Sequence, residues 1–371
     1  MLAALLLLAL QDVPRSAPLP EGADPARHGR LVREADGESV PSQRVGRTLH
    51  WVDDGGAHRY RLEEGFLKTS ARAAAVVSEG RHVTVSALGR DALRYTIGAP
   101  AAPAGIDPAH ERSAYLHPVW TPDGRTITND LPAKHPHHHG IWFSWRTGEF
   151  EGRKLNAFAP LEKLGRQEHA ALDGVFSGPV FGGFRARQRL VDLNAPGGPK
   201  TALEDVWELR VYGTGGLFVF DLDSTQTCAS ESAYTNQKNY YGGLGFRGSG
   251  DWEGKEGVSF LTSEGKTRLD GNGTAARWVA MNGKIGGRDA GFGFLGHPSN
   301  FRAPQRTRLH PSEPFFCWVP GAEAEHRIEP GKPYVSRYRF LSADRALGAE
   351  EMERHWSAYA DPGRGVELRV R

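Results

Sequence analysis

Short runs of alternating apolar and polar residues, each ended by glycine, proline, asparagine or aspartate, constrain the fold of this chain more than any other feature. Successive side chains of a β-strand point to opposite faces of its sheet, so this alternation is typical of antiparallel strands with one buried face. The 46 glycines and 24 prolines among 371 residues supply the turns that many short strands need. We therefore expect an all-β protein.

Several segments show the strand pattern clearly. Residues 82–87 and 92–97 flank a short turn and predict a β-hairpin. Three long runs at 187–193, 202–212 and 217–223 predict a succession of antiparallel strands. Further strands are predicted at 257–262, 276–281, 290–295, 314–319 and 334–341.

One segment near the end has the spacing of a helix. Residues 342–344 can cap it, and the apolar stripe that follows consists of Leu347, Met352, Trp356 and Tyr359. The chain has no strand–helix alternation and no glycine-rich nucleotide loop. The pattern predicts a large antiparallel β-sandwich with one C-terminal helix.

The first residues differ in character from the rest. Residues 1–10 form an apolar run of signal-peptide length, which predicts export to the periplasm or the medium. Residues 11–43 are rich in proline, alanine and charge, and predict a linker outside the fold. We expect one β-sandwich domain over residues 44–371.

Charge and cysteine content exclude several classes of protein. The 46 basic and 44 acidic residues give a net charge of +2, which does not indicate a nucleic-acid partner. No apolar run of membrane-spanning length follows Leu10, so no stable membrane span is expected. The two cysteines do not form a metal or redox motif; a buried apolar role is favoured for Cys317, and its pairing with Cys228 stays open.

A histidine-rich loop is the strongest functional signal. His117 precedes it, and His135, His137, His138 and His139 lie within it. Two chemistries suit such a cluster. The histidines can act as general acids and bases tuned by a neighbour such as Asp130. Alternatively, His135, His137 or His139, together with His117, can bind a divalent metal such as zinc, copper or iron. In an extended segment His137 and His139 share one face and His138 points to the other.

Other polar and aromatic residues are candidate substrate contacts. Tyr241 and Arg247 flank a glycine-rich turn, where tyrosine can stack on a sugar and arginine can hold a carboxylate. His297 and Asn300 follow a predicted strand, at a sheet rim where binding groups often lie. The remaining candidates are Trp142 and Lys238.

Several ordered motifs resemble those of the PmoA-like family of bacterial proteins over about residues 113–341. They are Leu116-His117-Pro118, residues 121–124, His135-Pro136-His137-His138, Gly140-Ile141, residues 241–247, residues 276–279 and residues 296–300. Although the family carries the label of a methane oxygenase, we reject methane oxidation because that activity needs several apolar membrane spans. The resemblance implies a galactose-mutarotase-like supersandwich, whose concave face holds sugars.

Together these observations predict an exported carbohydrate-active protein. In the enzyme that we expect, His117, His135, His137 and His138 move protons on a sugar or sugar acid, in an epimerase, lyase or hydrolase reaction without a cofactor. The alternatives are a glycan-binding module without catalysis and a metalloenzyme with histidine ligands.

Overall fold

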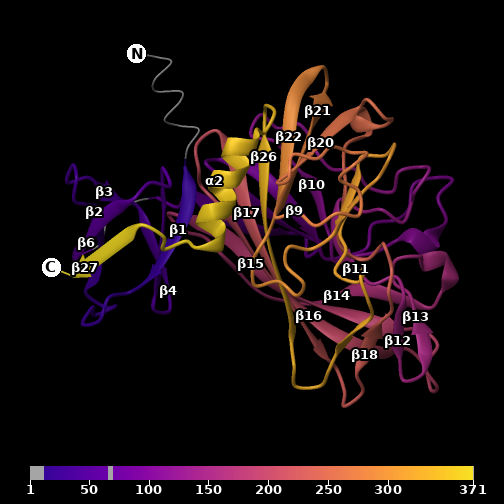
Figure 1. The fold of residues 1–371 in the computed structure, drawn as a ribbon. Coiled ribbons are helices and arrows are strands. Elements are labelled where there is room, and N and C mark those ends of the chain that lie inside the picture. The colour runs from indigo at the N-terminus through magenta and orange to yellow at the C-terminus, as the bar shows by residue number, and fades with distance from the viewer. Residues whose placement is uncertain (1–11, 66–69, 371) are drawn as a thin grey trace.

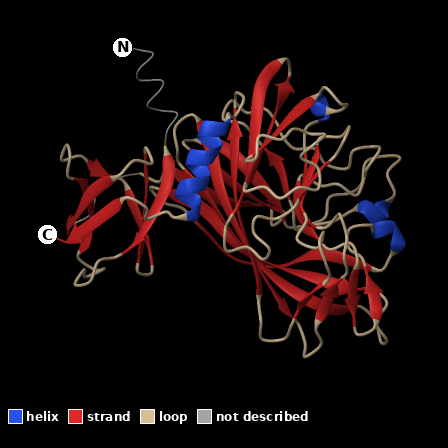
Figure 2. Cartoon of the chain, in the orientation of Figure 1, coloured by secondary structure: helices blue, strands red, loops and turns tan. Residues whose placement is uncertain are grey.

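The computed structural model describes residues 12–65 and 70–370, and strands make up most of it (Figures 1 and 2). Two eight-stranded sheets form the main body, and three smaller sheets accompany them. The prediction of an all-β antiparallel fold is confirmed. The predicted signal segment, residues 1–10, lies outside the described residues.

The first large sheet contains the longest strands and is antiparallel at every pairing. The predicted succession of three long strands is confirmed by β15, β16 and β17, which pair in that order. In spatial order the sheet consists of β14 (Gly165–Phe176), β15 (Phe181–Asp192), β16 (Lys200–Tyr212), β17 (Leu217–Cys228), β26 (Tyr334–Ala343), β22 (Arg288–Gly296), β21 (Trp278–Ile285) and β20 (Val258–Thr262).

The second large sheet holds shorter strands and carries the histidine-rich loop. Its strands β8 and β9 form the hairpin that the sequence predicts. In spatial order it consists of β23 (Thr307–Leu309), β24 (Phe315–Trp318), β19 (Gly243–Arg247), β11 (Ile141–Ser144), β10 (Leu116–Val119), β9 (Arg90–Thr96), β8 (His82–Ala87) and β7 (Ala73–Ser78).

Apolar side chains from both large sheets pack into one core. Phe246 of the second sheet stacks on Phe292 of the first, with ring centroids 4.8 Å apart. Tyr95 also packs on Phe184 across the two sheets, with the rings tilted and their centroids 4.7 Å apart, and all four side chains are buried. Because one face of each strand enters this core, the other face is free to carry polar groups.

A small sheet and three short 3₁₀ helices lie in the connections. The sheet consists of β13 (Arg153–Leu155), β12 (Gly148–Phe150), β18 (Tyr234–Asn236) and β25 (His326–Ile328). The 3₁₀ helices are η1 (Pro108–His110), η2 (Pro160–Glu162) and η3 (Gly250–Trp252).

The prediction that residues 11–43 form a linker is wrong for residues 12–43, which fold into strands. They complete an N-terminal β unit with a buried core that includes Leu31, Trp51 and Tyr60. The prolines of the first strand are tolerated because it lies at a sheet edge. The unit has one sheet of β1 (Val13–Pro18), β5 (Thr48–Asp53) and β4 (Ser42–Val45), and another of β27 (Val366–Val370), β6 (His58–Glu64), β2 (His28–Arg33) and β3 (Ser39–Val40).

The predicted boundary at residue 44 therefore falls inside this unit, within β4. The unit contacts the main body through helix α2 (Ala349–Ala360), which lies between them in Figure 1. Gln43 adds a second contact, since its side-chain oxygen accepts hydrogen bonds from the backbone nitrogens of Val180 and Phe181.

The predicted C-terminal helix exists, and it is the one α-helix among residues 12–65 and 70–370. It begins later than the sequence suggests, because β26 continues to Ala343 and Gly348 is the N-cap. Asp344 does not cap it, since its carboxylate accepts a hydrogen bond from the backbone nitrogen of Asp123. Met352 and Tyr359 are buried as expected.

Two further sequence expectations have structural outcomes. Within the described residues, no helix combines the length and the apolar character that crossing a membrane requires. Cys228 and Cys317 are free thiols, and Cys317 is buried as predicted.

Candidate functional site

The histidine-rich loop connects β10 to β11 and is held close to the sheet. Residues 131–138 form turns, and Asp130 and His139 form an isolated bridge. Gly140 then leads into β11 with a φ of 46°, a conformation that favours glycine. A Cβ atom there would lie 2.0 Å from the carbonyl oxygen of Leu116, so only glycine lets the loop pass β10 this closely.

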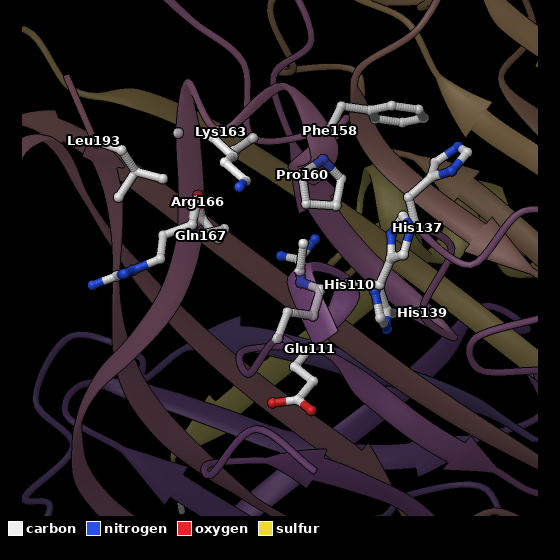
Figure 3. Close-up of a pocket in the computed structure, with 14 residues that line it drawn as sticks. His110, Glu111, His137, His139, Phe158, Pro160, Lys163, Arg166, Gln167 and Leu193 are labelled. Atoms are coloured by element: carbon white, nitrogen blue, oxygen red, sulfur yellow. The ribbon is translucent and has the colours of Figure 1, made fainter. Parts of the chain in front are cut away.

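His137 and His139 line one pocket, which we call the histidine pocket (Figure 3). His138 is not among the residues that line it. The alternation expected for an extended segment does not apply, because residues 131–138 form turns and the ring centroids of His137 and His138 lie only 4.4 Å apart. His138 is buried and stacks on Phe315, with ring centroids 4.6 Å apart.

The histidine pocket has a volume of about 280 Å³ and is built from four separate parts of the chain, namely residues 109–112, the histidine loop, residues 157–167 and Leu193. The histidine loop provides one wall. In Figure 3 the opposite wall is formed by Arg166, Gln167 and Leu193, near the start of β14 and the end of β15. His110, from η1, lies between the two walls.

A mostly buried carboxylate holds His139 in one orientation. Oδ1 of Asp130 lies 2.7 Å from Nδ1 of His139, and the Tyr115 hydroxyl donates to Oδ2 at 2.8 Å. An ionised carboxylate only accepts hydrogen bonds, so the proton of the imidazole lies on Nδ1. Nε2 of His139 then carries the lone pair and can accept a proton.

Burial sets the charge of these groups at neutral pH. It lowers the pKa of His139 to about 4, against the opposing effect of Asp130, and it lowers the pKa of His137 to about 4 with help from neighbouring histidines. Burial alone would raise the pKa of Asp130, but the hydrogen bond with His139 and the nearby His117 lower it overall. His137 and His139 are therefore neutral and Asp130 is ionised.

Cationic side chains outnumber acidic ones at the pocket. Arg112, Lys163 and Arg166 line it, against a single lining carboxylate from Glu111. Arg166 also pairs with Glu168, which lies outside the pocket lining. Burial lowers the pKa of Arg112 to about 10, so this guanidinium still carries its charge at neutral pH. The balance favours a ligand with a negative charge.

The other predicted catalytic histidines lie beside the pocket and do not line it. His135 stacks on His138 with ring centroids 5.1 Å apart. Nδ1 of His117 lies 2.9 Å from the Thr128 hydroxyl, and burial lowers the pKa of His117. The structure thus gathers the predicted histidines into one region and places His137 at the pocket itself.

Three predicted substrate contacts, Trp142, Tyr241 and Arg247, do not line the histidine pocket. Trp142 is buried, 5.3 Å from the ring of His138, and offers no exposed stacking face. The hydroxyl of Tyr241 accepts a hydrogen bond from Arg308 at 2.9 Å. Arg247 is fully buried and pairs with Glu253 and Glu313, which leaves it no exposed surface for a substrate carboxylate.

The last three predicted contacts lie away from the histidine pocket. His297 packs on Tyr359 of α2, with ring centroids 5.1 Å apart. The side-chain amide of Asn300 makes two hydrogen bonds with the backbone of Arg337: its nitrogen donates to the carbonyl oxygen, and its oxygen accepts from the backbone nitrogen. Lys238 is exposed and does not line the histidine pocket.

The donor set for a metal ion is not assembled. Throughout the described part of the chain, no three His, Cys, Asp or Glu side chains are grouped so that they could hold a metal. In particular, His117, His135 and His137 do not converge on one point. The geometry therefore does not support the metalloenzyme alternative built on these residues.

Sequence reasoning missed several residues of the pocket. His110 and Arg112 belong to a short charged segment before β10, and Gln167 is the third residue of β14, far along the chain. The cluster of His110, Glu111 and Arg112 was a usable signal because ionisable residues are concentrated there. The sequence around Gln167 gave no such signal, because only the folded sheet brings β14 close to the histidine loop.

Comparisons with solved structures give distant likenesses. The chain is similar to a heparan sulfate lyase from Pedobacter heparinus (9% identity, 72% of this chain and 34% of that one, TM-score 0.33). It is also similar to a GH36 alpha-galactosidase from Geobacillus stearothermophilus (9% identity, 76% of this chain and 42% of that one, TM-score 0.34). A third similar structure is that of a galactose mutarotase related enzyme from Lactobacillus acidophilus (8% identity, 74% of this chain and 100% of that one, TM-score 0.25). Likenesses at these scores support no statement about function.

The sequence itself places the chain in a family. No curated protein matches it at a significant level. Residues 82–357, which include the histidine loop and both large sheets from β8 onward, match the family described as "Family of unknown function (DUF6807)". This match covers well over half of the chain, and the protein belongs to the DUF6807 family.

Proposed function

We propose that the histidine pocket is the active site of a carbohydrate-active enzyme that moves a proton on a sugar acid. The observation that supports this most is the hydrogen-bonded series Tyr115–Asp130–His139 at the pocket wall. It leaves Nε2 of His139 as a proton acceptor in a fixed position, which is the requirement for a general base.

The step that suits these groups begins at a carbon next to a carboxylate. His139 takes the proton from this carbon, and the electron pair of the broken C–H bond moves onto the carboxylate oxygens. Arg112 stabilises the charge that develops there. If a proton returns to the opposite face of the same carbon, the reaction is an epimerisation. If the substituent on the adjacent carbon leaves with its bonding electrons, a C=C bond forms and the reaction is that of a lyase. His137 and His110, with ring centroids 6.4 Å apart, are the groups that can hand on a proton.

The choice of substrate rests on charge and on resemblance. Arg112, Lys163 and Arg166 favour a carboxylate-bearing ligand. The PmoA-like motifs noted in the sequence imply a sugar ligand, and membership of that family, without its methane chemistry, is part of the proposal. Export is also part of the proposal, because residues 1–10 form an apolar run of signal-peptide length. If the protein is exported, the chain recovered from outside the cytoplasm should have a shortened N-terminus.

Solvent hydrogen exchange tests the chemistry without knowledge of the exact product. The protein is incubated in D₂O with D-glucuronate, D-galacturonate and their oligomers, with D-glucose as the uncharged comparison, and proton NMR follows the carbon next to the carboxylate. We expect deuterium at that carbon, or a new C=C bond, with an acidic substrate. His139→Gln should lower the rate by about a hundredfold or more.

A matched histidine variant separates the base from general effects. His82→Gln changes a histidine of β8 that does not line the histidine pocket, and should leave the rate unchanged. Equal rates in His139→Gln and the native protein would refute the proposal. Binding of the acids without exchange or elimination would instead identify a glycan-binding module.

A further inference from the structure

A second cluster of charged residues lies on the outer face of the first large sheet. Arg210, Asp221 and Arg339 are direct neighbours across β16, β17 and β26. Two residues along the strands, Glu208, Asp223 and Arg337 are neighbours in the same way on the same face. Since residues two apart share a face, these side chains form two parallel rows of charge.

The N-terminal β unit and helix α2 cover these rows and leave a cavity between. Ser16 of β1, His50 of β5 and Tyr359 of α2 line it from one side, and the charged rows line it from the other. Its volume is about 160 Å³. We call it the charged cavity. His297, which the sequence predicted as a substrate contact, belongs to this cavity and not to the histidine pocket.

One ion pair at the base of the charged cavity is complete. Nε and Nη2 of Arg339 donate to the two oxygens of Asp221 at 2.7 and 2.9 Å. The Tyr212 hydroxyl donates to the same carboxylate at 2.9 Å. The charge of Asp221 is therefore satisfied within the protein and need not be met by a ligand.

Donors beside this pair are not satisfied. Nη1 of Arg339 is buried and has no hydrogen-bond partner among the described residues, and the same holds for the hydroxyl of Tyr359. Both side chains are more than nine-tenths buried and line the cavity. Buried donors are costly when unpaired, so a ligand that supplies acceptor oxygens would gain two hydrogen bonds here.

The charge balance identifies the kind of acceptor. Four arginines line the cavity, Arg15, Arg210, Arg337 and Arg339. Three of them have carboxylate partners of their own, since Arg15 lies 3.7 Å from Asp53, Arg210 pairs with Glu208 and Arg339 pairs with Asp221. Burial lowers the pKa of His50 to about 4 and also lowers the pKa of His297, so both imidazoles are neutral at neutral pH. Arg337 lies 3.9 Å from the carboxylate of Asp223, so its charge is only loosely paired and favours an anionic group of a ligand.

We propose that the charged cavity is a second binding site, which takes a small hydroxylated carboxylate about the size of one sugar unit. Nη1 of Arg339 and the Tyr359 hydroxyl donate to ligand oxygens, and Arg337 faces the carboxylate. Asp223 accepts from a ligand hydroxyl. The site is separate from the histidine pocket, because the residues that line the two cavities do not overlap.

Isothermal titration calorimetry of the full chain tests the site. The probes are D-glucuronate, D-galacturonate and D-gluconate, with D-glucose as the uncharged comparison. At least one acid should bind, and about tenfold or more tightly than D-glucose. Tyr359→Phe and Arg337→Gln should each weaken that binding by about tenfold, the effect of losing one hydrogen bond to a charged group.

Three controls keep the outcome clear. Tyr359→Phe removes only a hydroxyl that lacks a partner in the described structure, so its melting temperature should equal or exceed that of the native protein. Arg187→Gln changes a half-exposed arginine of β15 that pairs with Asp173, and should leave binding unchanged. His139→Gln should leave binding at the charged cavity unchanged as well.

The possible failures are distinct. If no acid binds, or if Tyr359→Phe and Arg337→Gln bind as the native protein does, the charged cavity is a structural ion-pair cluster and the inference is wrong. It is equally wrong if His139→Gln alone abolishes binding, since the acid then occupies only the histidine pocket. That last result would support the proposed function, so the two proposals fail separately.

Discussion

Asp130 and Tyr115 fix His139 in a single tautomer, and the protonation of this one imidazole governs the proposed chemistry. The sequence predicted that histidines of this loop would carry the function, with Asp130 as a neighbour. It did not single out His139, because the choice among adjacent histidines depends on which ring reaches the carboxylate. Periodicity assigns a side chain to a face but not to a hydrogen-bond partner.

The pH dependence of turnover should report on His139. Its pKa is about 4, so the imidazole keeps its lone pair above that pH and loses it to a proton below. We expect kcat/KM to stay level from neutral pH to about pH 5 and to fall near pH 4. An acidic limb near pH 6.5 would contradict this assignment. Circular dichroism at each pH shows whether the protein is still folded.

Removal of the Tyr115 hydroxyl should weaken catalysis without abolishing it. Tyr115→Phe deletes one hydrogen bond to Asp130 and leaves the ring in place. We expect a stability loss of about 1 kcal/mol in urea denaturation. Turnover should fall by less than in His139→Gln, because the base itself remains. An unchanged kcat would show that Tyr115 does not position the Asp130–His139 pair.

At the scale of elements, strand patterns were predicted well where strands are long and alternate regularly, as in β15 and β16. The strand β1 was missed, because its two prolines are typical of a linker. Proline cannot donate to a neighbouring strand, but β1 lies at a sheet edge and pairs only with β5. Edge position is a property of the assembled sheet, so the sequence of β1 alone does not reveal it.

The passage from the histidine loop into β11 depends on Gly140. In Gly140→Ala, the new Cβ would meet the carbonyl oxygen of Leu116 in a backbone conformation unfavourable for alanine. We expect a loss of about 2–3 kcal/mol in the free energy of unfolding, measured with urea.

Gly124→Ala is the matched control for this substitution. Gly124 also has a positive φ, of 87°, but a Cβ atom there has no neighbour within 4 Å in the described structure. It should lose only about 1 kcal/mol, the cost of the backbone conformation. Equal losses in both variants would show that close packing against β10 is unimportant.

At the scale of the whole molecule, buried neutral histidines make stability depend on pH. Burial lowers the pKa of His50, His137, His139, His310 and His326 to about 4, from 6.5 in an unfolded chain. Between these values the unfolded state binds more protons, so the free energy of unfolding falls as pH drops from 6.5 towards 4. Each fully buried histidine contributes up to about 1.4 kcal/mol per pH unit.

Urea denaturation at pH 7.5, 6 and 5 measures this dependence. His326→Gln should flatten the decline, because this buried imidazole has no hydrogen-bond partner within the described chain. Stability that does not change across this range would contradict the assigned protonation states.

The overall architecture was predictable because both large sheets follow from strand alternation and turn residues. The position of the histidine pocket was not, since it joins η1, the histidine loop and the start of β14. Those contacts arise only when the two large sheets pack together. The assignment of His297 to the charged cavity has the same cause, because only the folded chain brings α2 and β1 over that face.

The strand β27 runs parallel to β6, and Val366 lies opposite His58. A ribosome makes β6 long before it makes β27, so a sheet of the N-terminal unit stays open while the whole sandwich emerges. During translation the edge of β6 is exposed to any other strand nearby. Chaperones that shield unpaired strands should therefore bind nascent chains that contain β6 and lack β27.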